Sequence, residues 1–129
     1  MFNWISQLFK KRTAKPKPRY TSISGFKFFT PLEQLHNETH PAVITPDGYH
    51  IWYRYGRVGR SDGPSVETPA GSRYWFEGQE LHRSDGPAVE HSSGMKLFYL
   101  NGRELSFEEW LKRTELSKEK KVELALIYS

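Results

Sequence analysis

Short runs of aromatic and aliphatic residues, each ended by a glycine, alternate with polar turns along most of the chain. The stretch 49–55 is rich in aromatic and β-branched residues, which is typical of a strand. Gly56 ends this run, Gly78 ends the next one, and the pair 101–102 (Asn-Gly) ends the last. Such residues tolerate positive φ and favour tight hairpin turns. The pattern therefore predicts a series of β-hairpins.

The runs recur with a period of 23 residues. The residues that share this spacing are Gly25, Gly48, Gly71 and Gly94; Pro41, Pro64 and Pro87; Val43, Val66 and Val89; and the aromatic residues Phe29, Trp52, Trp75 and Phe98. The segments 59–66 and 82–89 are near copies, and 36–43 is a weaker copy. A strict period of this kind marks similar units that bury their apolar sides against each other. We therefore predict a mainly β fold with terminal helices, in which residues 21–105 form an antiparallel meander of 23-residue hairpin units and an elongated, twisted sheet.

The repeated pattern Gly-x-x-x-Trp-Tyr-x-x-Gly-x-x-x-Arg-Ser-Asp-Gly-Pro-x-Val resembles a variant of the MORN repeat. The resemblance covers residues 25–105 and departs from the standard MORN pattern at the Asp-Gly-Pro step. Units with an Arg-x-Asp-Gly-Pro-Ala core are similar to those of small bacteriophage and large-virus proteins, and related repeats occur in proteins labelled antitoxins. The resemblance implies a phage-type accessory protein that binds or inhibits a host factor.

Both faces of the predicted sheet carry aromatic side chains. Alternation along a strand places Trp52 and Trp75 on one face and their neighbours in sequence on the other. A lone antiparallel sheet usually has one polar face, so the second apolar face is either covered by the chain's own termini or contacts a partner. Aromatic side chains commonly anchor protein contacts. The predicted protein-binding surface consists of Trp52, Tyr53, Tyr55, Tyr74, Trp75 and Phe76.

The segment 106–129 is predicted to be a helical cap. Its first helix is expected over 106–113, because Ser106 and Glu109 have the spacing of a capping box. A second helix is expected after Ser117. The apolar positions on one side of each helix are Phe107, Trp110 and Leu111 in the first, and Val122, Ala125 and Leu126 in the second. We expect both helices to close the edge of the last unit and to shield its apolar face.

Residues 1–20 form an arm that is both aromatic and basic. On helical spacing one side carries Phe2, Trp4, Ile5, Leu8 and Phe9, and the basic residues of the arm are Lys10, Lys11, Arg12, Lys15, Lys17 and Arg19. Residues 1–32 contain seven basic residues and no acid, whereas the remainder is mildly acidic. The arm either enters the headgroup zone of an anionic membrane, docks on the sheet as a lid, or contacts nucleic acid.

Composition limits the compartment and the kinds of site. The chain has no cysteine, which excludes disulfides and thiolate metal sites and favours a reducing compartment. There is no apolar run long enough to span a bilayer, and the start is too short and polar for a signal peptide. We therefore expect the protein in the cytoplasm of a host cell, at the inner face of its membrane if the arm inserts.

The titratable residues do not suggest an active site. His36 and His40 are four residues apart, but the proline after His40 argues against a helical ligand pair, and we expect no metal and no cofactor. Asp62 and Asp85 recur at the repeat spacing, whereas a catalytic group is normally present once. We predict that they build turns by accepting backbone N–H bonds and that the preceding arginines, Arg60 and Arg83, pair with them.

The sequence thus predicts a non-enzymatic protein-interaction module. The alternatives are a peripheral membrane-associated scaffold attached by the arm, and an antitoxin-like or nucleic-acid-binding protein. The sequence predicts no oligomeric state.

Overall fold

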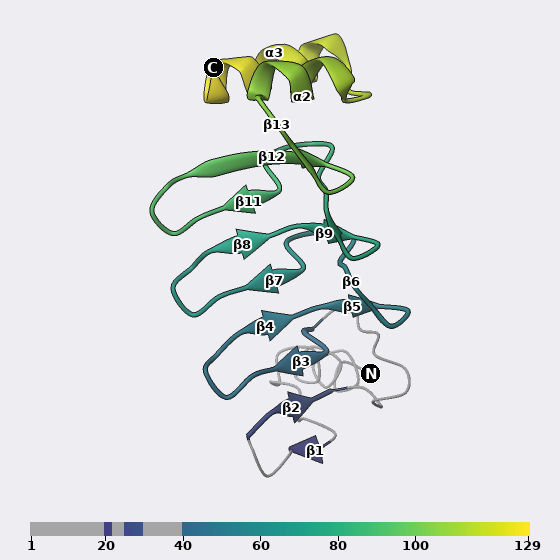
Figure 1. Cartoon of the computed structure of the whole chain (residues 1–129), viewed down its shortest axis with the longest axis vertical. Coiled ribbons are helices and arrows are strands. Elements are labelled where there is room, and N and C mark those ends of the chain that lie inside the picture. Colours follow the sequence, from purple (N-terminus) through teal and green to yellow (C-terminus); the bar gives the residue numbers. More distant parts are fainter. Residues whose placement is uncertain (1–19, 22–24, 30–39) are drawn as a thin grey trace, which may run out of the picture.

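The computed structural model describes residues 20–21, 25–29 and 40–129. This part of the chain is mainly antiparallel β-sheet followed by two C-terminal helices (Figure 1), so the predicted fold class is confirmed. The arm from Phe2 to Arg19 lies outside the described residues. Its predicted contacts with a membrane, the sheet or nucleic acid therefore stay predictions.

Nine short strands form one antiparallel sheet in the order β1-β2-β3-β4-β7-β8-β11-β12-β13. Their bounds are β1 Tyr20–Thr21, β2 Lys27–Phe28, β3 Val43–Ile44, β4 His50–Ile51, β7 Val66–Glu67, β8 Arg73–Tyr74, β11 Val89–Glu90, β12 Lys96–Leu100 and β13 Arg103–Leu105. Two separate hairpins consist of β5 (Tyr53–Arg54) with β6 (Arg57–Val58), and of β9 (Phe76–Glu77) with β10 (Glu80–Leu81). Figure 1 shows the units stacked along the long axis, with turns at one edge and hairpin tips at the other.

The register of the sheet produces two continuous rows of side chains. One row is apolar and consists of Phe28, Val43, Ile51, Val66, Tyr74, Val89 and Leu97. The other is mostly polar and consists of Lys27, Ile44, His50, Glu67, Arg73, Glu90 and Lys96. Cross-strand neighbours of this kind are the unit of sheet stabilisation. Each unit is therefore held mainly by contacts with the units before and after it.

Each unit leaves the long sheet at its central aromatic residue. The N–H of Trp52 donates to the carbonyl of Ser65, whereas its own carbonyl accepts from the N–H of Gly59. Hydrogen bonding thus switches at Trp52 from a neighbouring unit to the local hairpin β5–β6. This switch interrupts the strand after Ile51, and the same happens at Trp75. In the last unit the strand β12 runs through Phe98 without a break.

The glycines at one edge of the sheet share one backbone conformation. Gly25, Gly48, Gly71 and Gly94 have φ values of 88°, 95°, 94° and 95°. In three of these turns the glycine N–H donates to the carbonyl three residues earlier, for example from Gly48 to Thr45 at 3.0 Å. A left-handed residue after a tight turn suits glycine, which has no Cβ. Equal spacing in the sequence therefore corresponds to equal backbone conformation in the structure.

The hairpin tips at the opposite edge differ from the prediction in one respect. Both central residues of each tip have positive φ, in the pairs Tyr55 with Gly56, Gly78 with Gln79, and Asn101 with Gly102. This is the pattern of a type I′ turn, which continues the twist of the two strands. Gly56 and Gly78 were expected to be equivalent, but Gly78 occupies the first position of its turn and Gly56 the second. Consequently Tyr55 and Gln79 lie in left-handed conformations that the sequence did not indicate.

Two helices close the last unit, as predicted. They are α2 (Phe107–Arg113) and α3 (Lys118–Tyr128), with Ser106 and Ser117 as N-caps. The Ser106 hydroxyl accepts from the Glu109 N–H at 3.2 Å. The Glu109 carboxylate accepts from Arg113 at 2.8 Å instead of reaching back to the cap, and this hydrogen bond lowers the pKa of Glu109. The predicted capping box is therefore only half formed.

The core beneath the helices is aromatic, and one predicted helix face is wrong. Phe98, Trp110 and Leu124 form a buried cluster. In α3 the side that meets this cluster carries Leu124 and Tyr128, which are four residues apart and so share one face of the helix. The predicted stripe lies elsewhere, because Val122 is 61 % and Leu126 83 % exposed.

Candidate functional site

The repeated Arg-Ser-Asp-Gly-Pro steps hold arginines over tryptophans. The Arg60 guanidinium carbon lies 4.2 Å from the centre of the Trp52 ring, and that of Arg83 lies 4.0 Å from the Trp75 ring. An arginine over an indole face is attracted by the negative potential of the ring. We call the steps 60–64 and 83–87, each with its tryptophan, the first and second clamps. The arginine follows the tryptophan by eight residues in both copies, a spacing that could have revealed the clamp in the sequence.

The rest of each step orients the guanidinium. In the second clamp, Arg83 donates from Nε to Asp85 Oδ1 at 2.8 Å and from Nη1 to the Pro87 carbonyl at 3.1 Å. Nη1 also lies 3.5 Å from Glu90 Oε1. The first clamp has the same contacts: Arg60 to Asp62 at 2.9 Å, to the Pro64 carbonyl at 3.5 Å and to Glu67 at 3.8 Å. Pairing of these arginines with Asp62 and Asp85 is therefore confirmed, and the carboxylates accept from a guanidinium where backbone N–H groups were predicted.

The glycine of each step leaves room for the arginine. A Cβ built on Gly63 would lie 3.1 Å from Arg60 Cζ, and one on Gly86 would lie 2.8 Å from Arg83 Cζ. The second distance is shorter than packed atoms tolerate. Each step thus packs as a whole, through its arginine, aspartate, glycine and proline carbonyl, against its tryptophan. This structural role accounts for the recurrence of the step.

The residues of the predicted binding surface differ widely in how far their side chains are exposed. Trp52 is 5 % exposed and lies beneath Arg60, so its predicted exposure is wrong. The half-buried members of the set are Tyr53, Tyr74, Trp75 and Phe76. Tyr55 is 81 % exposed at the end of its hairpin. Alternation alone could not separate these cases, because the strand is interrupted at each tryptophan.

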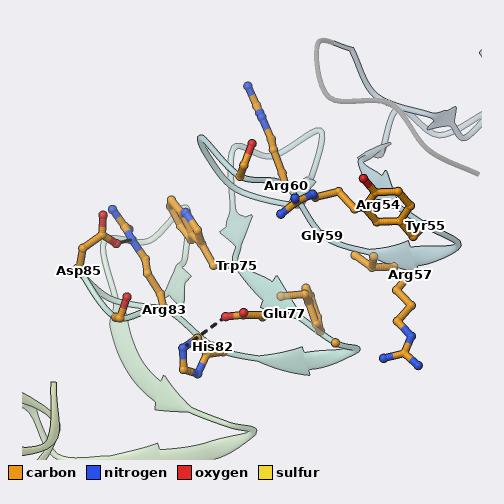
Figure 2. Close-up of a pocket in the computed structure, with 15 residues that line it drawn as sticks. Arg54, Tyr55, Arg57, Gly59, Arg60, Trp75, Glu77, His82, Arg83 and Asp85 are labelled. Atoms are coloured by element: carbon orange, nitrogen blue, oxygen red, sulfur yellow. Dashed lines mark hydrogen bonds and ion pairs between the residues drawn. The ribbon is translucent and has the colours of Figure 1, made fainter. Parts of the chain in front are cut away.

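A groove of about 820 Å³ lies between two consecutive hairpins (Figure 2). We call the hairpin over 53–58 the Arg tip and the hairpin over 76–81 the Glu tip. Trp75 and Phe76 are among the aromatic residues that line the groove, and the Arg tip contributes Arg54, Tyr55 and Arg57. The groove was not predicted, because it depends on the distance between two tips and not on any single motif.

Each tip places two like charges directly opposite each other. Arg54 pairs with Arg57 across β5 and β6, and Glu77 pairs with Glu80 across β9 and β10. Like charges in facing positions destabilise a hairpin. The two tips therefore share one backbone register and carry charges of opposite sign.

His82 supports the Glu tip from below. Its Nδ1 accepts from the Asn101 N–H at 2.9 Å, which places the proton of the neutral ring on Nε2. Nε2 lies 3.4 Å from Glu77 Oε2, a contact that Figure 2 marks with a dashed line. His82 thus links the groove to the next hairpin.

No protein-family model, curated protein or solved structure matches this chain. The resemblance to MORN repeats thus stays a prediction from the repeated residues. Within the described ranges, no group of three or more His, Asp or Glu side chains is placed to hold a metal ion. Neither α2 nor α3 is long and apolar enough to cross a membrane. What the groove offers chemically is an aromatic surface lined by four arginines (Arg54, Arg57, Arg60 and Arg83) and two carboxylates (Glu77 and Asp85).

Proposed function

We propose that this chain is a non-catalytic protein-binding module whose partner contacts the hairpin tips and the groove between them. As the resemblance implies, the module would belong to a phage-type accessory protein that acts on a host factor. The arginines and aspartates of the clamps already bond to each other, so we assign them to holding the wall of the groove in place.

The observation that carries the proposal is the position of Tyr55. This aromatic side chain is 81 % exposed at the end of the Arg tip, and its φ is 49°. A left-handed conformation costs a residue with a Cβ about 1 kcal/mol, and glycine or asparagine would avoid most of that cost. Backbone strain at an exposed position is typical of functional sites, and tyrosine is common among the residues that dominate binding energy.

Site-specific photocrosslinking tests this proposal. A benzophenone amino acid replaces Tyr55 in one variant and, as a matched control, Tyr49 in another. Tyr49 is a tyrosine that is 37 % exposed beside the turn at the opposite edge of the sheet. We expect a protein adduct from position 55 and not from position 49. Equal adducts at both positions, or an adduct from position 49 alone, would contradict the proposed surface.

A binding measurement with the crosslinked partner completes the test. Tyr55→Ser is expected to weaken binding by about 30-fold, the equivalent of a residue that contributes about 2 kcal/mol. Tyr49→Ser is expected to leave binding within about twofold, since residues outside the contact contribute little. Equal losses in both variants would show that the tip is not the contact.

A further inference from the structure

Hydrogen bonds close the gap between the second and third hairpins, but not the gap between the first and second. The closed gap lies between the Glu tip and the hairpin β12–β13. Its three bonds run from the Gly102 N–H to the Leu81 carbonyl at 2.9 Å, from the Arg83 N–H to the Tyr99 carbonyl at 3.2 Å, and from the Asn101 N–H to His82 Nδ1 at 2.9 Å. Within residues 40–129, all of which the structure describes, none of the three equivalent bonds joins the Arg tip to the Glu tip. The groove occupies this open gap.

Gly59 lies at the base of the open gap. It holds the position of His82 in the preceding unit, and the His82 ring contacts both the Asn101 N–H and Glu77 in the closed gap. Gly59 is buried and lines the groove, and a Cβ built on it would lie 3.7 Å from the Phe76 carbonyl oxygen, which is an ordinary contact. The base of the gap thus has room for a Cβ, but glycine does not supply the acceptor that the imidazole supplies one unit later.

The Gly78 N–H is the donor that this acceptor would serve. Both central residues of the two turns have positive φ, 58° and 73° at Gly78 and Gln79, and 50° and 78° at Asn101 and Gly102. Because the two turns share this conformation, the Gly78 N–H points toward the preceding hairpin as the Asn101 N–H does. The Asn101 N–H donates to His82, whereas the Gly78 N–H has no acceptor among the described residues. An occupant of the groove must therefore bring an acceptor.

Both carboxylates of the Glu tip are directed toward the closed gap. Glu77 Oε2 lies 3.4 Å from His82 Nε2, as Figure 2 shows. The side chain of Glu80 lies against Gly102, because its carbons would be 3.5–3.6 Å from a Cβ built there. An anion beside the Gly78 N–H would therefore not face these two carboxylates directly.

Arg57 gives the open gap a positive charge. It holds the position of Glu80 in the preceding unit and lines the groove, and Figure 2 shows its exposed side chain extending from its own hairpin toward the Glu tip. No acidic side chain in the described part of the chain lies within ion-pair distance of Arg57. Arg54 already makes an interaction of its own, and the clamp arginines are balanced by their aspartates. Arg57 is therefore the cation that an occupant would meet.

We propose that the groove takes an aspartate or glutamate side chain from an acidic segment of the protein partner. Its carboxylate would replace the His82 imidazole as acceptor, bonding to the Gly78 N–H and pairing with Arg57. Bonds from a backbone N–H to a carboxylate are shorter and stronger than neutral ones. This inference rests on the proposed function and names the chemistry of the partner at that site.

Nuclear magnetic resonance of the full ¹⁵N-labelled chain tests the proposal at single amides. The probe is a capped peptide of alternating glutamate and serine, and the control peptide carries glutamine in place of glutamate. We expect the glutamate peptide to move the Gly78 amide proton downfield and to leave that of Asn101 in place, because His82 already accepts from Asn101. A Gly78 resonance that stays still, moves equally with both peptides, or moves no more than that of Asn101 would overturn the proposal.

A substitution at Gly59 tests whether the open gap is the site. Gly59→His copies the residue that closes the next gap, and we expect it to weaken binding of the glutamate peptide by on the order of 10-fold, the equivalent of one hydrogen bond to a charged group. Gly59→Ala leaves the gap open and should keep the affinity within about twofold. Unchanged affinity in Gly59→His, or equal losses in both variants, would contradict the site.

Arg57→Gln tests the charge and does not depend on whether Gly59→His folds, which circular dichroism checks. We expect it to weaken binding of the glutamate peptide by about fivefold, the upper range for an exposed ion pair. Arg73→Gln removes the same charge from an exposed position of β8 outside the groove and should change the affinity by less than about twofold. Equal losses would show that only the net charge of the protein attracts the peptide, and would overturn the role of Arg57.

The outcomes also separate this inference from the proposed function. If a single-stranded oligonucleotide moves the Gly78 resonance and the glutamate peptide does not, the acidic protein segment is overturned as the occupant. If the peptide fails but the protein adduct at position 55 persists, the binding surface stands and only the chemistry of its occupant is different. Failure of the peptide together with the absence of any adduct at position 55 would overturn both.

Discussion

The clamps and the hairpin tips are halves of the same unit, yet the copies agree in one half and differ in the other. The clamps at 60–64 and 83–87 have the same sequence and the same bonds to within a few tenths of an ångström. The tips carry two arginines in one copy and two glutamates in the next. The residues that are the same in both copies are therefore those that hold the units together. At the tips, the positions that change between the copies include exposed ones, namely Tyr55, Arg57, Glu77 and Glu80.

The largest expected difference between the halves concerns the aromatic residues. Trp52→Ala should lower the free energy of unfolding by about 3–5 kcal/mol, because a buried indole is lost and Arg60 is left without its ring. Tyr55→Ala should change it by no more than about 0.5 kcal/mol, since the side chain is exposed. Urea unfolding measures both. Similar losses would show that the tip is as structural as the clamp.

A smaller difference is expected between two arginines. Arg83→Gln should cost about 1–3 kcal/mol, because it removes the cation–π contact and the ion pair with Asp85, and leaves Glu90 with Lys96 alone. Arg57→Gln removes a charge that faces Arg54 and should be neutral or slightly stabilising. The same urea titrations give both values. Equal destabilisation by the two substitutions would contradict the distinction.

Substitution of Ser65 tests whether a residue that differs between the copies can contribute to the free energy of unfolding. It occupies the position of Ala42 and Ala88, and its buried hydroxyl accepts from the Phe76 N–H at 3.2 Å and lies 3.3 Å from the Phe76 carbonyl. Ser65→Ala should cost about 1–2 kcal/mol in thermal or urea unfolding, because a buried N–H loses its acceptor. Ser61→Ala, at an exposed position of the first clamp, serves as the control and should leave the free energy of unfolding unchanged.

The smallest effect is expected at the Glu tip, and it is stabilising. Gln79 has a φ of 73°, so Gln79→Gly should raise the free energy of unfolding by about 0.5–1 kcal/mol. Its neighbour Glu80 lies in a strand, where glycine should be slightly destabilising instead. A melting temperature that falls with Gln79→Gly would show that the glutamine side chain holds the turn.

The sequence predicts the strands, turns and helices of this fold better than the contacts that their side chains make. Glycines at a fixed interval indicate the turns, because a left-handed backbone position limits the choice of residue. The N-caps at Ser106 and Ser117 were likewise predictable, since capping depends on local hydrogen bonds. Local physics accounts for these successes.

What could not be predicted depends on contacts between distant residues. Trp52 was expected at the surface, whereas it is buried, with the arginine eight residues later folded back over its ring. The stripe from Val122 to Leu126 has helical spacing, but the position of Phe98 decides which face of α3 is buried. The groove likewise exists only once two tips are placed side by side.

Thermal unfolding of a protein with altered tips tests most directly the claim that the clamps, and not the tips, hold the fold. The variant combines Tyr55→Ser, Arg57→Ser, Glu77→Ser and Glu80→Ser, and leaves every clamp residue in place. We predict a melting temperature within about 4 °C of the wild type, the shift that about 1 kcal/mol produces in a domain of this size. A fall of about 10 °C or more would contradict the account, because the tips would then contribute as much to stability as the clamps.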